Sequence, residues 1–211
     1  HGGNLYLVAQ ERGIDQNRLL DFSANINPLG LSRHVKAAIQ DNIEAITHYP
    51  DTRAATFKQA VSQYYKVAAE HITPGNGAVE LMYILCHMLH PQTVLVLAPT
   101  FSEYEHAARA AQAQIEYFYL SPEQQFQIHM DDLVARVATA DIVFIGNPNN
   151  PTGKLIRRDD LEFLLKSAEE SNTLVVIDES FLDFLLDDDD YTCRPLLIKY
   201  NNLIIIQSLT K

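Results

Sequence analysis

Four short segments of the chain carry groups that could do chemistry, and each one opens or follows a regular element. They are Thr73–Glu80 (Thr-Pro-Gly-Asn-Gly-Ala-Val-Glu), Gly146–Gly153 (Gly-Asn-Pro-Asn-Asn-Pro-Thr-Gly), Asp178 after an apolar run, and Ser208–Lys211. Each also has a purely structural interpretation as a Pro-Gly turn, a tight Asn-Pro turn, a local ion pair or a surface lysine. None of the four identifies a function by itself.

Taken together, the four segments supply complementary chemical groups. Backbone N–H groups at the helix start after Gly77 suit a phosphate, and the asparagines of the second segment suit hydrogen bonds to a ring. A buried Asp178 needs a cationic partner, and a desolvated Lys211 becomes a nucleophilic amine. This set fits pyridoxal 5′-phosphate, with Lys211 forming the Schiff base and Asp178 facing the pyridine nitrogen.

From residue 93 onward, short apolar runs alternate with helical patterns. The predicted strands are 93–98, 115–120, 141–145, 173–177 and 203–207, and the predicted helices between them are 102–113, 130–138 and 158–171. Continuous apolar runs such as 141–145 are typical of strands covered on both faces. We therefore predict an α/β fold with a mostly parallel sheet between helical layers, whose ligands bind beyond the carboxyl ends of the strands.

The remaining elements are predicted from local patterns. Ser102 with Glu105 has the form of a capping box, which predicts a helix start. The helix at 79–89 is apolar nearly all round and is predicted to be deeply buried. In the first 75 residues, the pattern predicts an irregular arm followed by two amphipathic helices, near 32–46 and 52–69.

The composition excludes several classes of protein. The chain has 211 residues, 16 Lys and Arg against 27 Asp and Glu, a net charge of −11, and 47% hydrophobic residues. This argues against a disordered chain and against nucleic acid as the main partner. Its apolar runs are too short to span a bilayer. Cys86 and Cys193 are expected to be reduced thiols in a cytoplasmic protein, and Asp187–Asp190 a solvated loop rather than a metal site.

Three motifs, Asn150–Gly153, Asp178-Glu179 and Ser208–Lys211, resemble those of fold-type I, class I/II aminotransferases, and the resemblance covers the whole chain. The segments 1–4, 20–30, 48–51 and 178–183 are similar to those of the threonine-phosphate decarboxylases of cobalamin synthesis, close relatives of the histidinol-phosphate aminotransferases. The resemblance implies decarboxylation of L-threonine O-3-phosphate to (R)-1-aminopropan-2-yl phosphate. Alternatives are a histidinol-phosphate or related aminotransferase, and a non-catalytic fragment or dimerisation module.

The resemblance also implies a domain organisation. Residues 1–48 would form an N-terminal arm and first helix, and residues 49–211 an incomplete large domain that binds the cofactor. A C-terminal small domain, with the arginine that binds the substrate carboxylate, would follow beyond Lys211. Because the chain stops directly after a predicted buried strand, we expect it to be a fragment.

The resemblance assigns roles around the cofactor ring. Phe101 would stack on the pyridine ring, with Tyr104 as the fallback, and Asn150 would bind the ring hydroxyl O3′. Asp178 would keep the ring nitrogen protonated. The groups around the phosphate would be Asn76, Gly77, Ala78, Ser208 and Thr210.

Other implied roles concern the substrate and a second subunit. Phe181 stands where many aminotransferases have a Tyr that binds O3′, and the decarboxylase pattern accepts this Phe. Tyr49 resembles the tyrosine that reaches across a homodimer to the neighbouring cofactor phosphate. The candidates for contacts to the phosphorylated substrate are His1, Asn4, Ser23, Asn25 and Asn27.

Overall fold

A computed structural model describes residues 3–25, 27 and 29–210 of the chain. The chain divides into two compact units, one comprising residues up to Thr52 and the other Arg53–Thr210. The second unit contains the sheet and nearly all of the buried residues. No helix in the described part of the chain is long and apolar enough to cross a membrane.

The second unit alternates helices and strands, as the sequence predicts. Its α-helices are α3 (Ala55–Tyr65), α4 (Ala78–Leu89), α5 (Glu103–Ala110), α6 (Met130–Val137) and α7 (Arg158–Glu170). Its strands are β1 (Thr93–Ala98), β2 (Gln114–Tyr119), β3 (Ile142–Gly146), β4 (Leu174–Asp178) and β5 (Leu203–Ile206). Each strand lies within one residue of its predicted range, so the continuous apolar runs are confirmed as strands.

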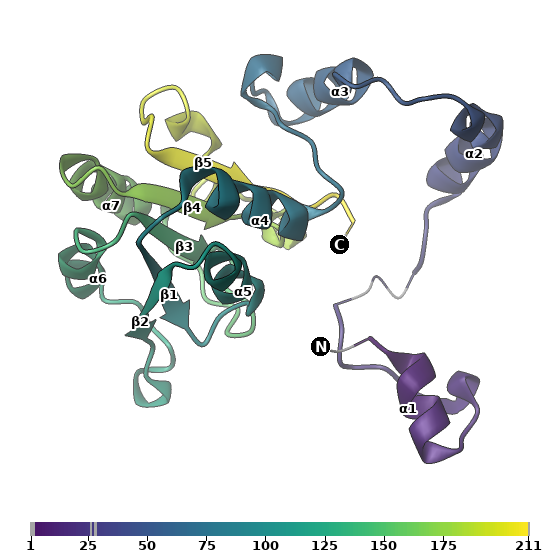
Figure 1. The fold of residues 1–211 in the computed structure, drawn as a ribbon, viewed down its shortest axis with the longest axis horizontal. Helices are drawn as coiled ribbons and strands as arrows, with labels where there is room; N and C mark the ends of the chain where they lie inside the picture. The colour runs from purple at the N-terminus through teal and green to yellow at the C-terminus, as the bar shows by residue number, and fades with distance from the viewer. Residues whose placement is uncertain (1–2, 26, 28, 211) are drawn as a thin grey trace. The chain divides into compact units, whose positions relative to one another are not determined.

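The five strands form one parallel sheet in the order β2-β1-β3-β4-β5 (Figure 1). The order reverses direction at β1, because β2 lies on one side of it and the later strands lie on the other. In the register of the central strands, Gly146 pairs with Asp178, and Asp178 pairs with Ile206. The carboxyl ends of these three strands therefore lie side by side.

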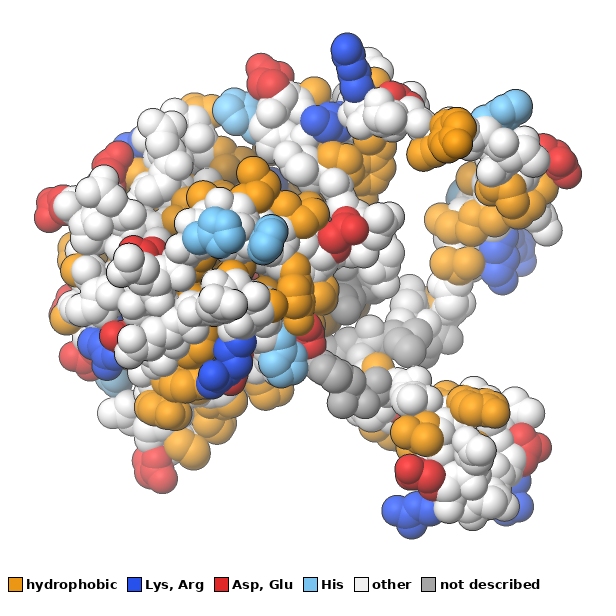
Figure 2. Space-filling model, in the orientation of Figure 1, with side chains coloured by type: hydrophobic (Ala, Val, Ile, Leu, Met, Phe, Trp, Pro, Cys, Tyr) orange, Lys and Arg blue, Asp and Glu red, His pale blue; other side chains and the backbone are white. Residues whose placement is uncertain are grey.

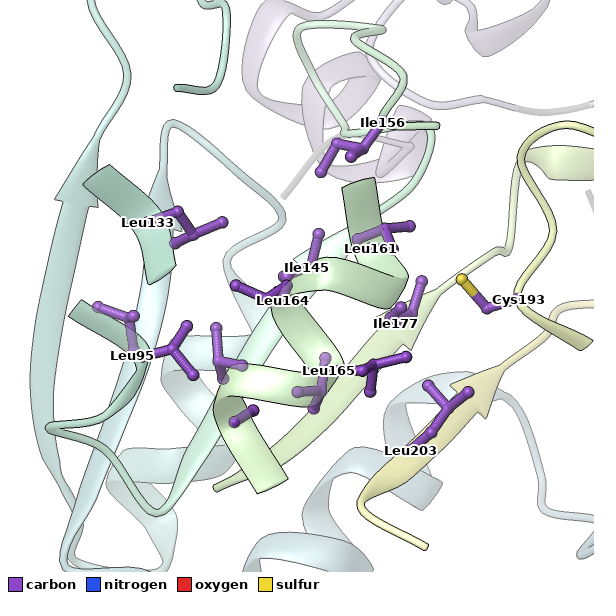
Figure 3. Close-up of a cluster of buried hydrophobic side chains, with 14 of the residues drawn as sticks. Leu95, Leu133, Ile145, Ile156, Leu161, Leu164, Leu165, Ile177, Cys193 and Leu203 are labelled. Atoms are coloured by element: carbon purple, nitrogen blue, oxygen red, sulfur yellow. The ribbon is translucent and has the colours of Figure 1, made fainter. Parts of the chain in front are cut away.

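Side chains that alternate along each strand form two separate hydrophobic cores. Helices α6 and α7 cover one face, where Val143, Ile145 and Ile177 pack against Leu161 and the rest of that cluster (Figure 3). Helices α4 and α5 cover the other face, which is made by a second set of strand residues that includes Val94, Val96, Ile142, Phe144 and Val176. The predicted α/β sandwich is therefore confirmed, with helices on both faces of a parallel sheet.

The first unit consists of short helices with no buried residue among them. It contains α1 (Leu5–Arg12), α2 (Arg33–Asp41) and the 3₁₀ segments Gln16–Arg18 and Ile43–Thr47. Apolar side chains such as Val35 and Ile39 on α2 are exposed. The amphipathic pattern therefore predicted the helix correctly, although the helix is shorter than expected and continues as a 3₁₀ segment.

The prediction that α4 is deeply buried is wrong. Only Met82 and Cys86 are buried on this helix, whereas Ile84 is 45% and Met88 74% exposed. Figure 2 shows hydrophobic side chains on the outward surface of this helix. The reason is geometric: a helix that packs on one face of a sheet buries a single stripe, whatever the composition of its other faces.

Two further expectations have different outcomes. The capping box is not formed, because Ser102 has helical backbone angles and Glu105 bonds Arg109 at 2.7 Å instead. The acidic run behaves as a solvated loop, in which Asp188 pairs with Arg194 and Asp190 with Arg157. Within the described residues, no group of acidic, His or Cys side chains is arranged to hold a metal.

A large-to-small substitution tests the core between α7 and the sheet. Leu164 is fully buried, so Leu164→Ala should lower the free energy of unfolding by about 2–5 kcal/mol through lost burial and a residual cavity. Lys166→Ala, at an exposed position of the same helix, should change it by less than about 0.5 kcal/mol. Urea unfolding of the protein measures both, and equal losses would contradict this packing.

Candidate active site

The Asp178 carboxylate lies at the end of β4 and is almost completely buried, with 7% of the residue exposed. Its Oδ1 accepts a hydrogen bond from the Ser180 backbone N–H at 2.9 Å, and its Oδ2 accepts one from the Tyr104 hydroxyl at 2.8 Å. Two donors compensate part of the cost of burying this charge. Each oxygen retains a further lone pair, so the carboxylate can also accept a bond from a ligand.

Tyr104 lies on α5 inside the core, not in an open position. The residue is 2% exposed, its ring stacks on Phe144 at a centroid distance of 5.2 Å, and the Phe101 ring packs against it in a T-shaped arrangement with centroids 5.6 Å apart. Burial raises the pKa of the Tyr104 phenol well above its ordinary value, and the neighbouring Asp178 charge adds to the effect. The phenol is therefore a permanent donor. Tyr104, the fallback for stacking on a cofactor ring, is thus buried, whereas Phe101 is only partly buried.

A missing side chain at the end of β3 makes room for this contact. A Cβ atom built on Gly146 would lie 3.2 Å from the Tyr104 hydroxyl oxygen and 3.2 Å from the Asn149 Cα atom. Gly146 pairs with Asp178 in the sheet. A larger residue at position 146 would therefore crowd the Tyr104 hydroxyl, which donates a hydrogen bond to Asp178. A side chain at the glycine that opens the Gly146–Gly153 segment would therefore be tightly packed, and its neighbours would have to shift by a few tenths of an ångström.

The asparagines after β3 divide into structural and open positions. The Asn147 Oδ1 atom accepts from the Ile156 N–H at 2.8 Å. The Asn149 Oδ1 atom accepts from the Thr100 hydroxyl at 2.6 Å. Asn150 is partly exposed, and within the described residues its side chain makes no hydrogen bond. Of these three asparagines, Asn147 and Asn149 therefore hold the turn, and Asn150 has a side-chain amide without a partner within the described residues.

A cavity of about 290 Å³ opens between the start of α4 and the segment that follows β5. Its lining includes four of the five residues predicted to surround a phosphate, namely Gly77, Ala78, Ser208 and Thr210. Gly77 has a φ of 95°, a conformation that favours glycine, directly before the helix. The structure thus brings together free helix N–H groups and two hydroxyls, a donor set that suits a phosphate.

Asn76, the fifth predicted phosphate residue, has an internal partner. Its backbone N–H donates to Glu80 Oε2 at 2.7 Å, and its side-chain amide donates to Glu80 Oε1 at 3.3 Å. Glu80 lies in the first turn of α4, where a negative charge is favourable. This carboxylate orders the glycine-bearing turn that leads into the helix.

Sequence reasoning missed Glu179, the residue next to Asp178. It is completely buried, and it accepts from the Cys193 N–H at 2.6 Å, the Thr192 hydroxyl at 3.0 Å and the Gln207 side-chain amide at 3.1 Å. It therefore ties the end of β4 to a distant loop and to the segment after β5. Its position directly after a buried strand is the signal in the sequence that points to it.

The candidate substrate residues of the first unit take part in local turns. Asn4 caps α1 by accepting from the Leu7 N–H at 3.1 Å, and Asn27 accepts from the Leu29 N–H at 3.0 Å. The Ser23 hydroxyl accepts from the Gly3 N–H at 2.7 Å. Asn25 and Tyr49 are exposed.

Three predicted site residues remain, namely Phe181, His1 and Lys211. The Phe181 ring lies near Phe184, with centroids 6.1 Å apart. His1 and Lys211 lie outside the described residues.

The parallel sheet between two helical layers, with polar strand ends and a cavity at the start of α4, defines an α/β protein of the class in which ligands generally bind beyond the carboxyl ends of the strands. The sequence pattern of aminotransferase class I and II matches residues 17–211. The chain therefore belongs to the class I and II aminotransferase family.

Three relatives illustrate the similarity. The threonine-phosphate decarboxylase of Salmonella typhimurium is 34% identical over the whole chain, which spans 57% of that protein. An adenosylcobalamin biosynthesis bifunctional protein of Leptospira interrogans is also 34% identical over the whole chain, which spans 24% of it. The crystal structure of the histidinol-phosphate aminotransferase from Clostridium acetobutylicum is 32% identical with a TM-score of 0.82, covering 92% of this chain and 56% of that one. The chain thus spans just over half the length of the single-function relatives.

The buried Glu179 should make stability depend on pH. Burial raises its pKa from about 4.5 to about 7, against the effects of its hydrogen bonds and of Arg194; the Asp188 charge adds to the rise. The folded state therefore holds this proton more tightly, and the contribution to stability is complete below pH 4.5 and lost as the pH rises through 7. The loss should be about 3 kcal/mol.

Glu179→Gln removes the titrating group and should flatten this part of the profile of unfolding free energy against pH. Urea unfolding between pH 4.5 and 8.5 measures the slope. Glu169→Gln, at an exposed position on α7, is the control and should leave the slope unchanged. The same slope in the Glu179 variant as in the unmodified protein would contradict the assignment.

Proposed function

We propose that the protein containing this chain is a pyridoxal phosphate-dependent lyase that decarboxylates L-threonine O-3-phosphate for cobalamin synthesis. The products are (R)-1-aminopropan-2-yl phosphate and CO2. Support comes from the decarboxylase and cobalamin-synthesis relatives, which are similar over the entire chain.

The buried Asp178 carboxylate is the observation that carries the cofactor assignment. It ends a strand at the ligand-binding edge, is held by two donors and can accept a third bond. A cationic N–H is the partner that such a charge requires, and a protonated pyridine nitrogen supplies one. The cofactor, when bound, supplies an electron-withdrawing ring conjugated to the substrate.

Each remaining residue has a proposed task around that ring. Phe101 would stack on it, and Asn150 would donate to its hydroxyl O3′. Phe181 cannot donate a hydrogen bond, so the ring hydroxyl would depend more on Asn150. The residues proposed to bind the cofactor phosphate are Asn76, Gly77, Ala78, Ser208 and Thr210.

Lys211 is proposed to hold the cofactor covalently and then to deliver a proton to the substrate. Decarboxylation breaks the bond between the substrate Cα and its carboxylate, CO2 leaves, and a proton takes its place at Cα. Lys211 or a water molecule would deliver that proton. The orientation in which the protein holds the substrate would decide which bond at Cα breaks, and hence the reaction.

The first unit is proposed to serve the substrate and a second subunit. Residues 1–48 would act as an arm over the substrate phosphate, with His1, Asn4, Ser23, Asn25 and Asn27 as contacts. Tyr49, which is 101% exposed, would reach the cofactor phosphate of the partner in a homodimer. Residues 49–211 would belong to the large domain.

Histidinol-phosphate aminotransferase is the second candidate, and the similarity to its crystal structure favours it. It would use the same cofactor and another phosphorylated substrate, but would break the Cα–H bond. Phe181 argues for the decarboxylase, because many aminotransferases have a Tyr at this position.

Product analysis distinguishes the candidates. The holoenzyme, made from the whole polypeptide that contains this sequence, should release CO2 from L-threonine O-3-phosphate without a 2-oxo acid. Glutamate formation from 2-oxoglutarate with no CO2 would instead establish an aminotransferase. A protein that shows no absorbance band of bound cofactor would be the non-catalytic module.

Asp178→Asn in the same holoenzyme should lower kcat by at least about a hundredfold, because a neutral amide cannot stabilise the ring cation. Asp141→Asn is the matched control. Asp141 accepts from the Gln92 and Thr93 N–H groups at 2.7 and 2.9 Å, at the start of the strands and away from the ligand edge. Full activity in the Asp178 variant would overturn the role proposed for this residue.

A further inference from the structure

The Tyr104 hydroxyl makes a contact that the proposed roles do not use. It donates to Asp178 Oδ2 at 2.8 Å across 74 residues of sequence, and it belongs to a ring that packs against both Phe101 and Phe144. Within the described residues, it is the side-chain donor to this carboxylate, and the Ser180 N–H is the backbone donor to the other oxygen. Half of the hydrogen bonding that fixes Asp178 therefore comes from one buried phenol.

We propose that Tyr104 is a positioning residue that acts on the cofactor ring through Asp178. By donating to Oδ2, it holds the plane of the carboxylate and weakens the carboxylate as a base. A weaker base leaves the shared proton on the ring nitrogen and does not draw it onto Asp178. This inference rests on the proposed function, because it presumes that Asp178 faces the ring nitrogen.

The surroundings of the hydroxyl support a fixed donor. Gly146 leaves space that a Cβ atom would take from the hydroxyl oxygen. Phe144 stacks on the ring and Phe101 packs against it in a T-shaped arrangement, so the hydroxyl oxygen has little freedom to move away from Asp178. Burial and the Asp178 charge both raise the pKa of the phenol, so it stays protonated throughout the working range of pH. A rigid, always protonated donor has a constant effect on its acceptor.

The decisive measurement is the ¹⁵N chemical shift of the ring nitrogen in holoenzyme loaded with ¹⁵N-labelled pyridoxal phosphate. In Tyr104→Phe, which keeps the ring and loses the hydroxyl, the signal should move from the pyridinium position towards that of neutral pyridine. The same variant should lose roughly tenfold in kcat with little change in KM, as for the loss of a hydrogen bond to a charged group.

Tyr200→Phe is the matched control for the loss of a buried phenol. Tyr200 is 4% exposed, and its hydroxyl donates to a carboxylate, Glu162, at 2.9 Å in the α7-side core. Its variant should leave the ¹⁵N shift and kcat unchanged. A change of the same size in both variants would mean that Tyr104 acts only through general stability.

A second substitution tests the direction in which the ¹⁵N signal moves. It remains informative even if the Tyr104→Phe variant does not fold. Tyr104→3-fluorotyrosine retains the packing and makes the phenol a stronger donor. It should move the ¹⁵N signal further towards the pyridinium position, opposite to Tyr104→Phe. With a cofactor analogue that has carbon in place of the ring nitrogen, the unmodified enzyme and Tyr104→Phe should have the same residual kcat.

The outcomes separate this inference from the function on which it rests. An unmodified protein that binds no labelled cofactor would overturn the proposed function. A protein that binds it, but shows the same ¹⁵N shift in the unmodified, Phe and fluorotyrosine forms, would overturn the role of Tyr104 alone.

Discussion

The Asp178 carboxylate lies in the interior at the end of β4, where a charge is tolerated only if donors surround it. One donor is the Ser180 N–H, which fixes the turn after the strand, and the other is Tyr104, which fixes α5 against the sheet. A Cβ atom on Gly146 of the neighbouring strand would lie 3.2 Å from the Tyr104 hydroxyl oxygen, so a side chain there would force this oxygen to shift. One buried charge thus constrains a turn, a helix and an adjacent strand.

Glu179 applies the same physical rule on the opposite side of the sheet. Successive side chains of an extended segment point in opposite directions, so two neighbouring acids serve different layers. Asp178 meets α5, whereas Glu179 accepts bonds from Cys193 and Gln207. Gln207 directly precedes the Ser208–Lys211 segment. The pair of acids therefore ties α5, the loop at Cys193 and the segment after β5 to the end of β4, which is where precise geometry matters for chemistry.

Local patterns in the sequence predicted the strands and the strand-end segments well, because burial on both faces leaves a continuous apolar run. They predicted the contacts of those segments poorly. The bond from Tyr104 to Asp178 joins residues far apart in sequence, and nothing near Tyr104 signals it. For α4, the apolar composition predicted too much burial. Composition shows that a side chain is apolar, but not whether another element covers it.

Under the proposed function, the residues around Asp178 would serve a decarboxylase and an aminotransferase equally, since both need a protonated pyridine ring in the cofactor. Discrimination then depends on how the substrate is held, and its phosphate offers only acceptors. Asn4 and Asn27 use their carbonyl oxygens to accept local N–H groups in the first unit. Each amide keeps its NH₂ group for bonds outside its own turn. Asn4 and Asn27 thus keep donors, which is the polarity that binding a phosphate requires, whereas the Ser23 hydroxyl already donates to Asp21 at 2.6 Å.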